Sequence, residues 1–198
     1  MASPEIVQNY GWTHQSTGTT SILGLQILNQ LRALAPAKVL DLGSGNGELC
    51  GYLHMNGFDI VGCEFDSQGI EVSRAAFPDI PFYQHGVQDD PALIVSSCGL
   101  FNAVVSTEVI EHLYSPQQLL HFSREVLVDH GYLLITTPYH GYLKNLALSI
   151  SDKWDKHHTS LRDGGHIKFF SKRTLAKLLL DSGFDIVDFH GIGRFNYL

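Results

Sequence analysis

Apolar residues follow two spacings that alternate along the chain, which predicts strands and helices in alternation. Short, nearly continuous apolar runs are typical of strands buried on both faces, and apolar residues every three or four positions are typical of amphipathic helices. Glycine or proline ends most segments. The pattern predicts strands at 38–42, 58–64, 80–84, 101–106, 132–138 and 184–191, and helices at 22–34, 47–57, 67–77, 89–98, 115–131 and 171–184.

Three of the predicted helices carry clear start or stop signals. Ser115 is expected to cap helix 115–131, with Gln118 completing a capping box, and Ser171 to cap helix 171–184. Asp66 is expected to cap helix 67–77. Gly183 is expected to end the last helix.

This alternation predicts an α/β fold with an open, mostly parallel sheet of six or seven strands and helices on both faces. The length suits a single domain spanning 1–198. Residues 1–20 form a polar N-terminal arm, and residues 139–170 form the one long insertion, which we expect to be a lid over the substrate. The last strand of this predicted sheet would leave an edge open for pairing, so a homodimer is possible.

Composition narrows the classes of function. The net charge of −7 opposes a broad surface for phosphates, so nucleic acid is an unlikely partner. Three cysteines without a C-x-x-C pair fit a reducing cytoplasm. No apolar run reaches the roughly 20 residues that span a bilayer, and the first residues lack the features of a signal peptide.

A glycine-rich loop joins the first predicted strand to the next helix. The stretch VLDLGSGNGE places Gly43, Gly45 and Gly47 after Asp41. Glycine allows tight turns and close approach of a ligand, and the helix start offers unpaired N–H groups. The spacing differs from the dinucleotide fingerprint G-x-G-x-x-G, so a nicotinamide cofactor is disfavoured. A purely structural turn is the alternative.

The second predicted strand ends in Glu64. A carboxylate at this point can accept hydrogen bonds from both hydroxyls of a ribose. The alternative is a surface carboxylate at a strand end.

Together, DLGSGNGE and VGCEFD resemble the first two motifs of class I S-adenosylmethionine-dependent methyltransferases, over roughly residues 37–190. The resemblance implies a Rossmann-like fold and S-adenosylmethionine as cofactor, with S-adenosylhomocysteine as product. It places the methionine part against the glycine loop and the ribose on Glu64. The implied cofactor residues are Asp41, Gly43, Ser44, Gly45, Gly47, Glu64, Val87, Gln88, Ser106 and Thr107.

The stretch VVSTEVIEHL puts two carboxylates and an imidazole directly after a buried strand. On a helix, Glu108, Glu111 and His112 would share one face. Such a group can hold a divalent metal, more readily manganese, iron or zinc than magnesium because of the imidazole. Alternatively His112 is a metal-free base or pocket residue, or the group is the polar edge of a helix.

His166, in DGGHIKFFS, is the candidate for a fourth ligand. E-x-x-E-H followed by H-x-K-F resembles the ubiquinone-biosynthesis O-methyltransferases, the group most like this chain, and the small-RNA 2′-O-methyltransferases. The resemblance implies a metal at Glu108, Glu111, His112 and His166. His112 and His166 are also the candidate catalytic bases.

The expected function is therefore S-adenosylmethionine-dependent O-methylation of a small aromatic or apolar hydroxylated molecule. The apolar and aromatic residues of 137–154 suit such an acceptor, although they also suit the packing of an accessory helix. The alternatives are a non-catalytic module that binds S-adenosylmethionine and an RNA 2′-O-methyltransferase.

Overall fold

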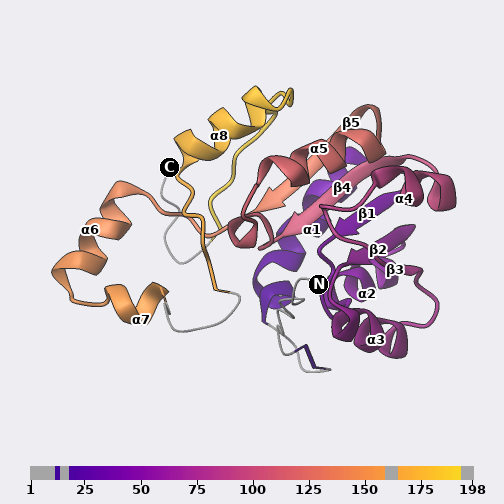
Figure 1. Cartoon of the computed structure of the whole chain (residues 1–198), viewed down its shortest axis with the longest axis horizontal. Coiled ribbons are helices and arrows are strands. Elements are labelled where there is room, and N and C mark those ends of the chain that lie inside the picture. The colour runs from indigo at the N-terminus through magenta and orange to yellow at the C-terminus, as the bar shows by residue number, and fades with distance from the viewer. Residues whose placement is uncertain (1–11, 14–17, 159–164, 193–198) are drawn as a thin grey trace, which may run out of the picture.

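The computed structural model describes residues 12–13, 18–158 and 165–192. Helices and strands alternate through the first two thirds of the chain, as the apolar pattern predicts (Figure 1). The elements are α1 (Thr19–Leu34), β1 (Val39–Leu42), α2 (Glu48–Met55), β2 (Ile60–Glu64), α3 (Ser67–Ala76), β3 (Phe82–Gln84), α4 (Pro91–Cys98), β4 (Phe101–Thr107), a 3₁₀ turn (Ile110–His112), α5 (Gln117–Val126), β5 (Leu127–Thr136), α6 (Tyr142–Ile150), α7 (Trp154–His158) and α8 (Lys172–Asp181).

The strands form one parallel sheet in the order β3-β2-β1-β4-β5. Leu40 pairs with Val61 of β2 on one side and with Val104 of β4 on the other. The strand order therefore reverses between β1 and β4, and in open α/β sheets ligands bind beyond the strand ends at this switch point. The predicted class, a doubly wound parallel sheet, is confirmed.

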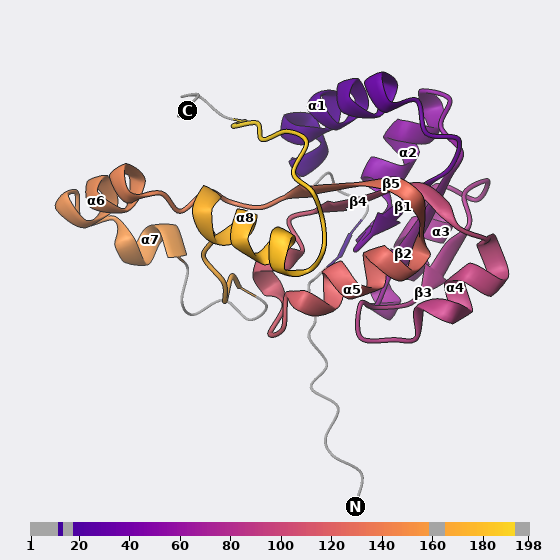
Figure 2. The same ribbon diagram turned by 90° about the horizontal axis from the view of Figure 1, so that it is seen from above.

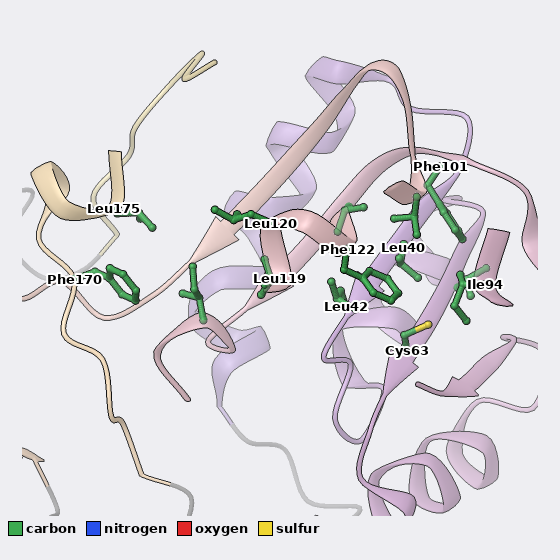
Figure 3. Close-up of a cluster of buried hydrophobic side chains, with 14 residues drawn as sticks. Leu40, Leu42, Cys63, Ile94, Phe101, Leu119, Leu120, Phe122, Phe170 and Leu175 are labelled. Carbon is green, nitrogen blue, oxygen red and sulfur yellow. The ribbon is translucent and has the colours of Figure 1, made fainter. Parts of the chain in front are cut away.

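Successive residues of the strands face two separate cores. Val39, Ala103 and Val105 pack against α1, α2 and α3. Leu40 and Val104 face the opposite side, where α4, α5 and α8 contribute Ile94, Phe122 and Leu175 among others (Figure 3). Burial on both faces explains why the central strands are uninterrupted apolar runs.

The predicted helix 115–131 is wrong at both ends. Pro116 is the N-cap without a side-chain cap bond, and Ser115 Oγ instead donates to Gln117 Oε1. The helix stops at Val126, because Leu127 pairs with Phe101 and begins β5. The apolar sequence of this stretch suits a helix or a strand equally, and the long-range pairing decides.

The predicted sixth strand, 184–191, does not form within the described part of the chain. Its alternation is strand-like, but no backbone ladder engages it, and Val187 is 81% exposed. The segment after α8 is drawn as a coil (Figure 2). In the described residues β5 therefore has a strand neighbour on one side only, and the homodimer at this edge stays a prediction.

Other predicted helix ends are confirmed. Ser171 and Thr174 form a capping box at α8, and Asp66 accepts from the amides of Gln68 and Gly69 at α3. Gly183 follows α8 with a φ of 80°, the left-handed conformation that glycine adopts without strain.

The insertion contributes α6 and α7, which project away from the sheet in both views (Figures 1 and 2). No residue of α6 is buried. The base of the projection is fixed, because Tyr139 bridges Phe170 and the amide of His140 donates to the Phe170 carbonyl at 2.8 Å. A lid role for 139–170 stays a prediction.

None of the helices within the described ranges combines the length and the apolar character that crossing a membrane requires. Most of the expected arm 1–20 lies outside the described residues, which there comprise residues 12–13 and 18–20.

Candidate active site

The glycine-rich loop turns sharply between β1 and α2. Gly43, Gly45 and Gly47 have φ values of 87°, 54° and 77°, which L side chains rarely adopt. The amides of Gly43 and Ser44 donate to the Cys63 carbonyl at 2.8 and 2.9 Å and tie the loop to β2. Gly47 is the N-cap of α2.

The loop after β4 touches this glycine loop. A Cβ added to Gly43 would lie 2.4 Å from Cγ2 of Val109, closer than side-chain contacts allow. Val109 follows β4, within the turn that also carries Glu108 and Glu111. The glycine loop and the turn that carries Glu108 and Glu111 are therefore in contact at the switch point between β1 and β4.

Glu64, at the end of β2, lies beneath the glycine loop. Its Oε2 accepts from the Gly45 amide at 2.9 Å, and its Oε1 accepts from the Asp66 amide at 2.9 Å. Burial raises the pKa of Glu64, and the two amide hydrogen bonds oppose that shift. Each carboxylate oxygen can accept a second hydrogen bond, so a ribose diol remains chemically compatible.

Asp41 is 1% exposed at the end of β1. Its Oδ2 accepts from Cys50 Sγ at 3.2 Å, whereas its buried Oδ1 has no hydrogen-bond donor among the residues that the structure describes. Burial raises the pKa of Asp41 to about 7, with the Glu64 carboxylate adding to the increase. A buried acceptor of this kind favours a ligand that brings a donor or a positive charge.

Val87 and Gln88 follow β3, at the same edge of the sheet. Val87 is half-buried against the core and Gln88 is exposed. The turn between them and β3 is held by the Gly86 amide, which donates to Asp89 Oδ2 at 2.7 Å. Contact of these residues with an adenine ring stays a prediction.

Trp12 and Asn46 connect the arm to the glycine loop, and neither is among the site residues that the sequence predicts. A Cβ on Gly45 would lie 2.5 Å from Cη2 of Trp12, and one on Gly69 would lie 3.1 Å from its Cδ1. The side chain of Asn46 donates to the Thr13 carbonyl at 3.1 Å. An aromatic side chain of the arm thus lies on the glycine loop. A tryptophan in an otherwise polar arm is the only sequence signal for it.

Ser106 and Thr107 end β4. The hydroxyl of Ser106 is buried and donates to the Leu42 carbonyl at 2.8 Å, which fastens the end of β4 to the end of β1. Thr107 is half-buried and pairs with Thr136. Their contact with the cofactor stays a prediction.

The carboxylates after β4 do not lie on an α-helix, so that expectation is wrong. Pairing of β4 with β5 continues to Thr107, and Glu108 then turns in the left-handed region with a φ of 55°. Glu108 Oε1 accepts from Thr136 Oγ1 at 2.9 Å. A single 3₁₀ turn over Ile110–His112 follows.

His166 nevertheless reaches this turn. Its Nε2 lies 3.9 Å from Glu111 Oε1, and its ring meets the His112 ring edge-on at 4.8 Å between centroids. The amides of Ile167 and Lys168 donate to the Glu111 carbonyl at 3.0 and 2.9 Å, which positions the segment. One ligand atom each of Glu111, His112 and His166 lies within 4.8 Å of the others. Glu108 is a neighbour of this trio rather than a member.

Glu108 and Glu111 both have raised pKa values, so the two side chains do not readily carry negative charges at the same time. Burial, and then the Glu108 carboxylate, raise the pKa of Glu111 to about 8. Burial also raises the pKa of Glu108. Glu111 is 1% exposed, and neither of its side-chain oxygens has a hydrogen-bond partner among the described residues. Such a site can exchange a proton or accept a cation.

A family model described as a methyltransferase domain matches residues 23–188. The chain belongs to the methyltransferase family. The matched region contains the whole sheet, the glycine loop, Glu64 and the Glu111–His112–His166 trio, so the methyltransferase domain includes every described part of the site except Trp12 and Thr13.

Named relatives are distant. The ubiquinone biosynthesis O-methyltransferase of Psychrobacter arcticus is 24% identical over 165 residues, covering 79% of this chain and 63% of the relative. The corresponding enzyme of Cereibacter sphaeroides is 26% identical over 159 residues, with 78% and 63% covered. The chain thus spans less than two thirds of the length of these relatives.

Solved structures share the fold. A putative methyltransferase of Bacillus halodurans superposes with a TM-score of 0.64 at 19% identity, covering 84% of this chain and 72% of that one. The plantazolicin methyltransferase BpumL, solved with a triazolic desmethylPZN analogue and S-adenosylhomocysteine, also gives a TM-score of 0.64, at 13% identity, covering 84% of this chain and 64% of that one. The architecture is that of class I S-adenosylmethionine-dependent methyltransferases.

Proposed function

We propose that this methyltransferase domain moves the methyl group of S-adenosylmethionine to a hydroxyl oxygen of a small aromatic or apolar acceptor. The observation that carries the proposal is the contact between Gly43 and Val109, which joins a cofactor-type loop to the Glu111–His112–His166 trio. The acceptor class follows the names of the distant ubiquinone relatives and the apolar residues of α6.

Each group of cofactor residues suits a different part of S-adenosylmethionine. The backbone of the glycine loop, at Gly43, Ser44, Gly45 and Gly47, allows the cofactor to approach closely. Asp41 Oδ1, which has no donor among the described residues, suits the ammonium of the methionine part. Glu64 suits the hydroxyls of the ribose. Val87 and Gln88 border the adenine, and Ser106 and Thr107 border the methionyl end.

Methyl transfer proceeds by in-line displacement at carbon, and the sulfonium loses its positive charge as the new C–O bond forms and the C–S bond breaks. The protein accelerates this step by aligning oxygen, methyl and sulfur in a site that excludes water. An oxygen acceptor also loses its proton. His166 or His112 takes that proton, because both imidazoles lie at the turn beside the glycine loop.

The trio also fits a divalent metal. The buried Glu111 carboxylate lacks a hydrogen-bond partner and has two imidazoles beside it, a donor set that suits manganese, iron or zinc better than magnesium. Glu111, His112 and His166 would hold the ion, with Glu108 next to them. Such an ion would supply Lewis acidity, which would make an acceptor hydroxyl easier to deprotonate.

A hollow of about 230 Å³ lies on α6 and is a candidate contact surface for the acceptor. Leu143, Ala147 and Leu148 line it together with Lys144 and Ser151. The positive charge of Lys144 acts on Glu108, so the hollow and the polar turn lie within electrostatic range of each other.

The test combines binding and turnover. We expect S-adenosylhomocysteine, and not NAD, to raise the thermal unfolding temperature of the chain. We also expect methylated product and S-adenosylhomocysteine when S-adenosylmethionine is supplied with a panel of catechols and phenols. Stabilisation by NAD alone would contradict the cofactor assignment. Binding of S-adenosylhomocysteine without product across the panel would favour a non-catalytic binding module.

A further inference from the structure

A second group of histidines lies outside the trio, on the projecting segment. His140 follows β5, and His157 and His158 end α7. The ring centroids are 6.0 Å apart for His140 and His157, 5.4 Å for His140 and His158, and 5.0 Å for His157 and His158. Three imidazoles from two separate elements therefore lie next to one another.

Two of these rings carry buried nitrogens that the described protein atoms leave unsatisfied. His140 is 8% exposed, and its Nε2 has no hydrogen-bond partner. The Nε2 of His158 is likewise buried without one. A buried polar atom without a partner destabilises the folded state. A species bound between the rings would satisfy both nitrogens at once.

The ring spacing agrees with shared coordination. Imidazoles bound to a tetrahedral zinc ion through nitrogens at about 2.0–2.1 Å place their ring centroids roughly 5 Å apart. The three observed separations lie at and slightly above that value. The nitrogens converge less tightly than those of Glu111, His112 and His166, so binding requires the side chains to rotate.

The surroundings suit a metal ligand set. Phe169 meets the rings of His140 and His158 at 4.9 and 5.0 Å, and Trp154 lies 4.4 Å from His158. The Lys144 ammonium, which donates to the Tyr139 carbonyl at 2.9 Å, is a nearby positive charge and opposes cation binding.

We propose that His140, His157 and His158 form a separate site for a borderline divalent transition metal, of the class of zinc, cobalt or nickel. A set of three imidazoles without a carboxylate selects such ions over magnesium and calcium. The ion fastens α7 to the end of β5, where the backbone of His140 is already anchored to Phe170. The proposal does not depend on methyl transfer.

The test titrates Co²⁺ into the metal-stripped full chain and follows visible absorption, with Zn²⁺ as competitor. A His112→Gln/His166→Gln background removes imidazoles of the trio. In that background we expect one Co²⁺ equivalent with the intense spectrum of tetrahedral nitrogen ligation. We expect His157→Gln to lower the affinity at least about tenfold. His157 is exposed, so this variant keeps its fold, whereas the exposed His121→Gln serves as the matched control.

A second readout follows the projecting segment itself. Bound Zn²⁺ is expected to slow tryptic cleavage after Lys144 and Lys153, and His157→Gln is expected to abolish that protection. The proposal is overturned if the background variant binds neither Co²⁺ nor Zn²⁺ at micromolar concentrations. It is also overturned if His157→Gln and His121→Gln bind the metals equally well.

Discussion

His166 Nε2 lies 3.9 Å from Glu111 Oε1. Glu111 lies in the 3₁₀ turn after β4, whereas His166 lies in the segment that precedes α8. Backbone hydrogen bonds from Ile167 and Lys168 to the Glu111 carbonyl enforce this approach. Main-chain contacts therefore hold the segment of His166 against the turn of Glu111, so side-chain substitutions at these residues can test the proposed chemistry and leave the turn in place.

Gly43→Ala is expected to abolish binding of S-adenosylhomocysteine. The added Cβ would lie 2.4 Å from Val109 and push apart the loops after β1 and β4. Gly57→Ala is the matched control, because Gly57 has nearly the same φ of 88° with nothing within 4 Å of an added Cβ. Both variants carry about 1 kcal/mol of backbone strain. Calorimetric titration measures the difference, and equal binding by both would contradict the role of the Gly43–Val109 contact.

Glu64→Gln is expected to weaken binding of S-adenosylhomocysteine by at least about tenfold, since a ribose hydrogen bond to a charged acceptor contributes about 1.5–3 kcal/mol. The amide oxygen of the variant can still accept from one of the two backbone amides that Glu64 now satisfies. The exposed Glu71→Gln on α3 is the control for the loss of a charge. Unchanged affinity in Glu64→Gln would remove Glu64 from the cofactor site.

Asp41 is expected to make the ligand-free chain less stable as the pH rises from about 4 to 7. Asp41 binds its proton with a pKa of about 7 in the folded state but 3.8 in the unfolded state, so over this interval only the folded state holds the proton. The free energy of unfolding then falls with rising pH, by up to about 4 kcal/mol from this residue. The free energy of unfolding of Asp41→Asn, measured with urea, should change less with pH than that of the unmodified chain. An equal pH dependence in the two proteins would contradict the raised pKa of Asp41.

Trp12 is expected to report cofactor binding by fluorescence. Its ring lies on Gly45 and Gly69, directly beside Glu64. The other tryptophan, Trp154, lies on α7. S-adenosylhomocysteine should therefore change the emission of Trp154→Phe, in which Trp12 remains, and leave that of Trp12→Phe nearly constant. The reverse pattern would place the cofactor away from the glycine loop.

The sequence predicted the parts of the fold that local patterns specify. The runs around Leu40 and Val104 are apolar at every position because both faces of these strands are buried, and that is visible in the sequence. The stretch at Leu127 was mispredicted because only its pairing with Phe101 separates strand from helix. Residues 184–191 have a strand-like pattern, but a strand also needs a neighbour to pair with.

The candidate site likewise has parts that local sequence patterns predict and parts that depend on long-range contacts. The glycine loop and Glu64 follow from spacing at strand ends, and His166 follows from its place just before the last predicted helix together with the family resemblance. The left-handed turn at Glu108 depends on β4–β5 pairing, which no local signal encodes. The contact of Trp12 with Gly45 joins the arm to the loop, and long-range contacts of this kind are absent from residue patterns.

The most direct test of the proposed function is single-turnover methyl transfer from labelled S-adenosylmethionine by His166→Gln, with the acceptor that the catechol and phenol panel identifies. We expect a rate about 10²–10⁴-fold below that of the unmodified chain, the loss typical of removing a general base, with unchanged affinity for S-adenosylhomocysteine. The exposed His121→Gln should retain the full rate. An undiminished rate in His166→Gln would contradict the assignment of catalysis to the Glu111–His112–His166 trio.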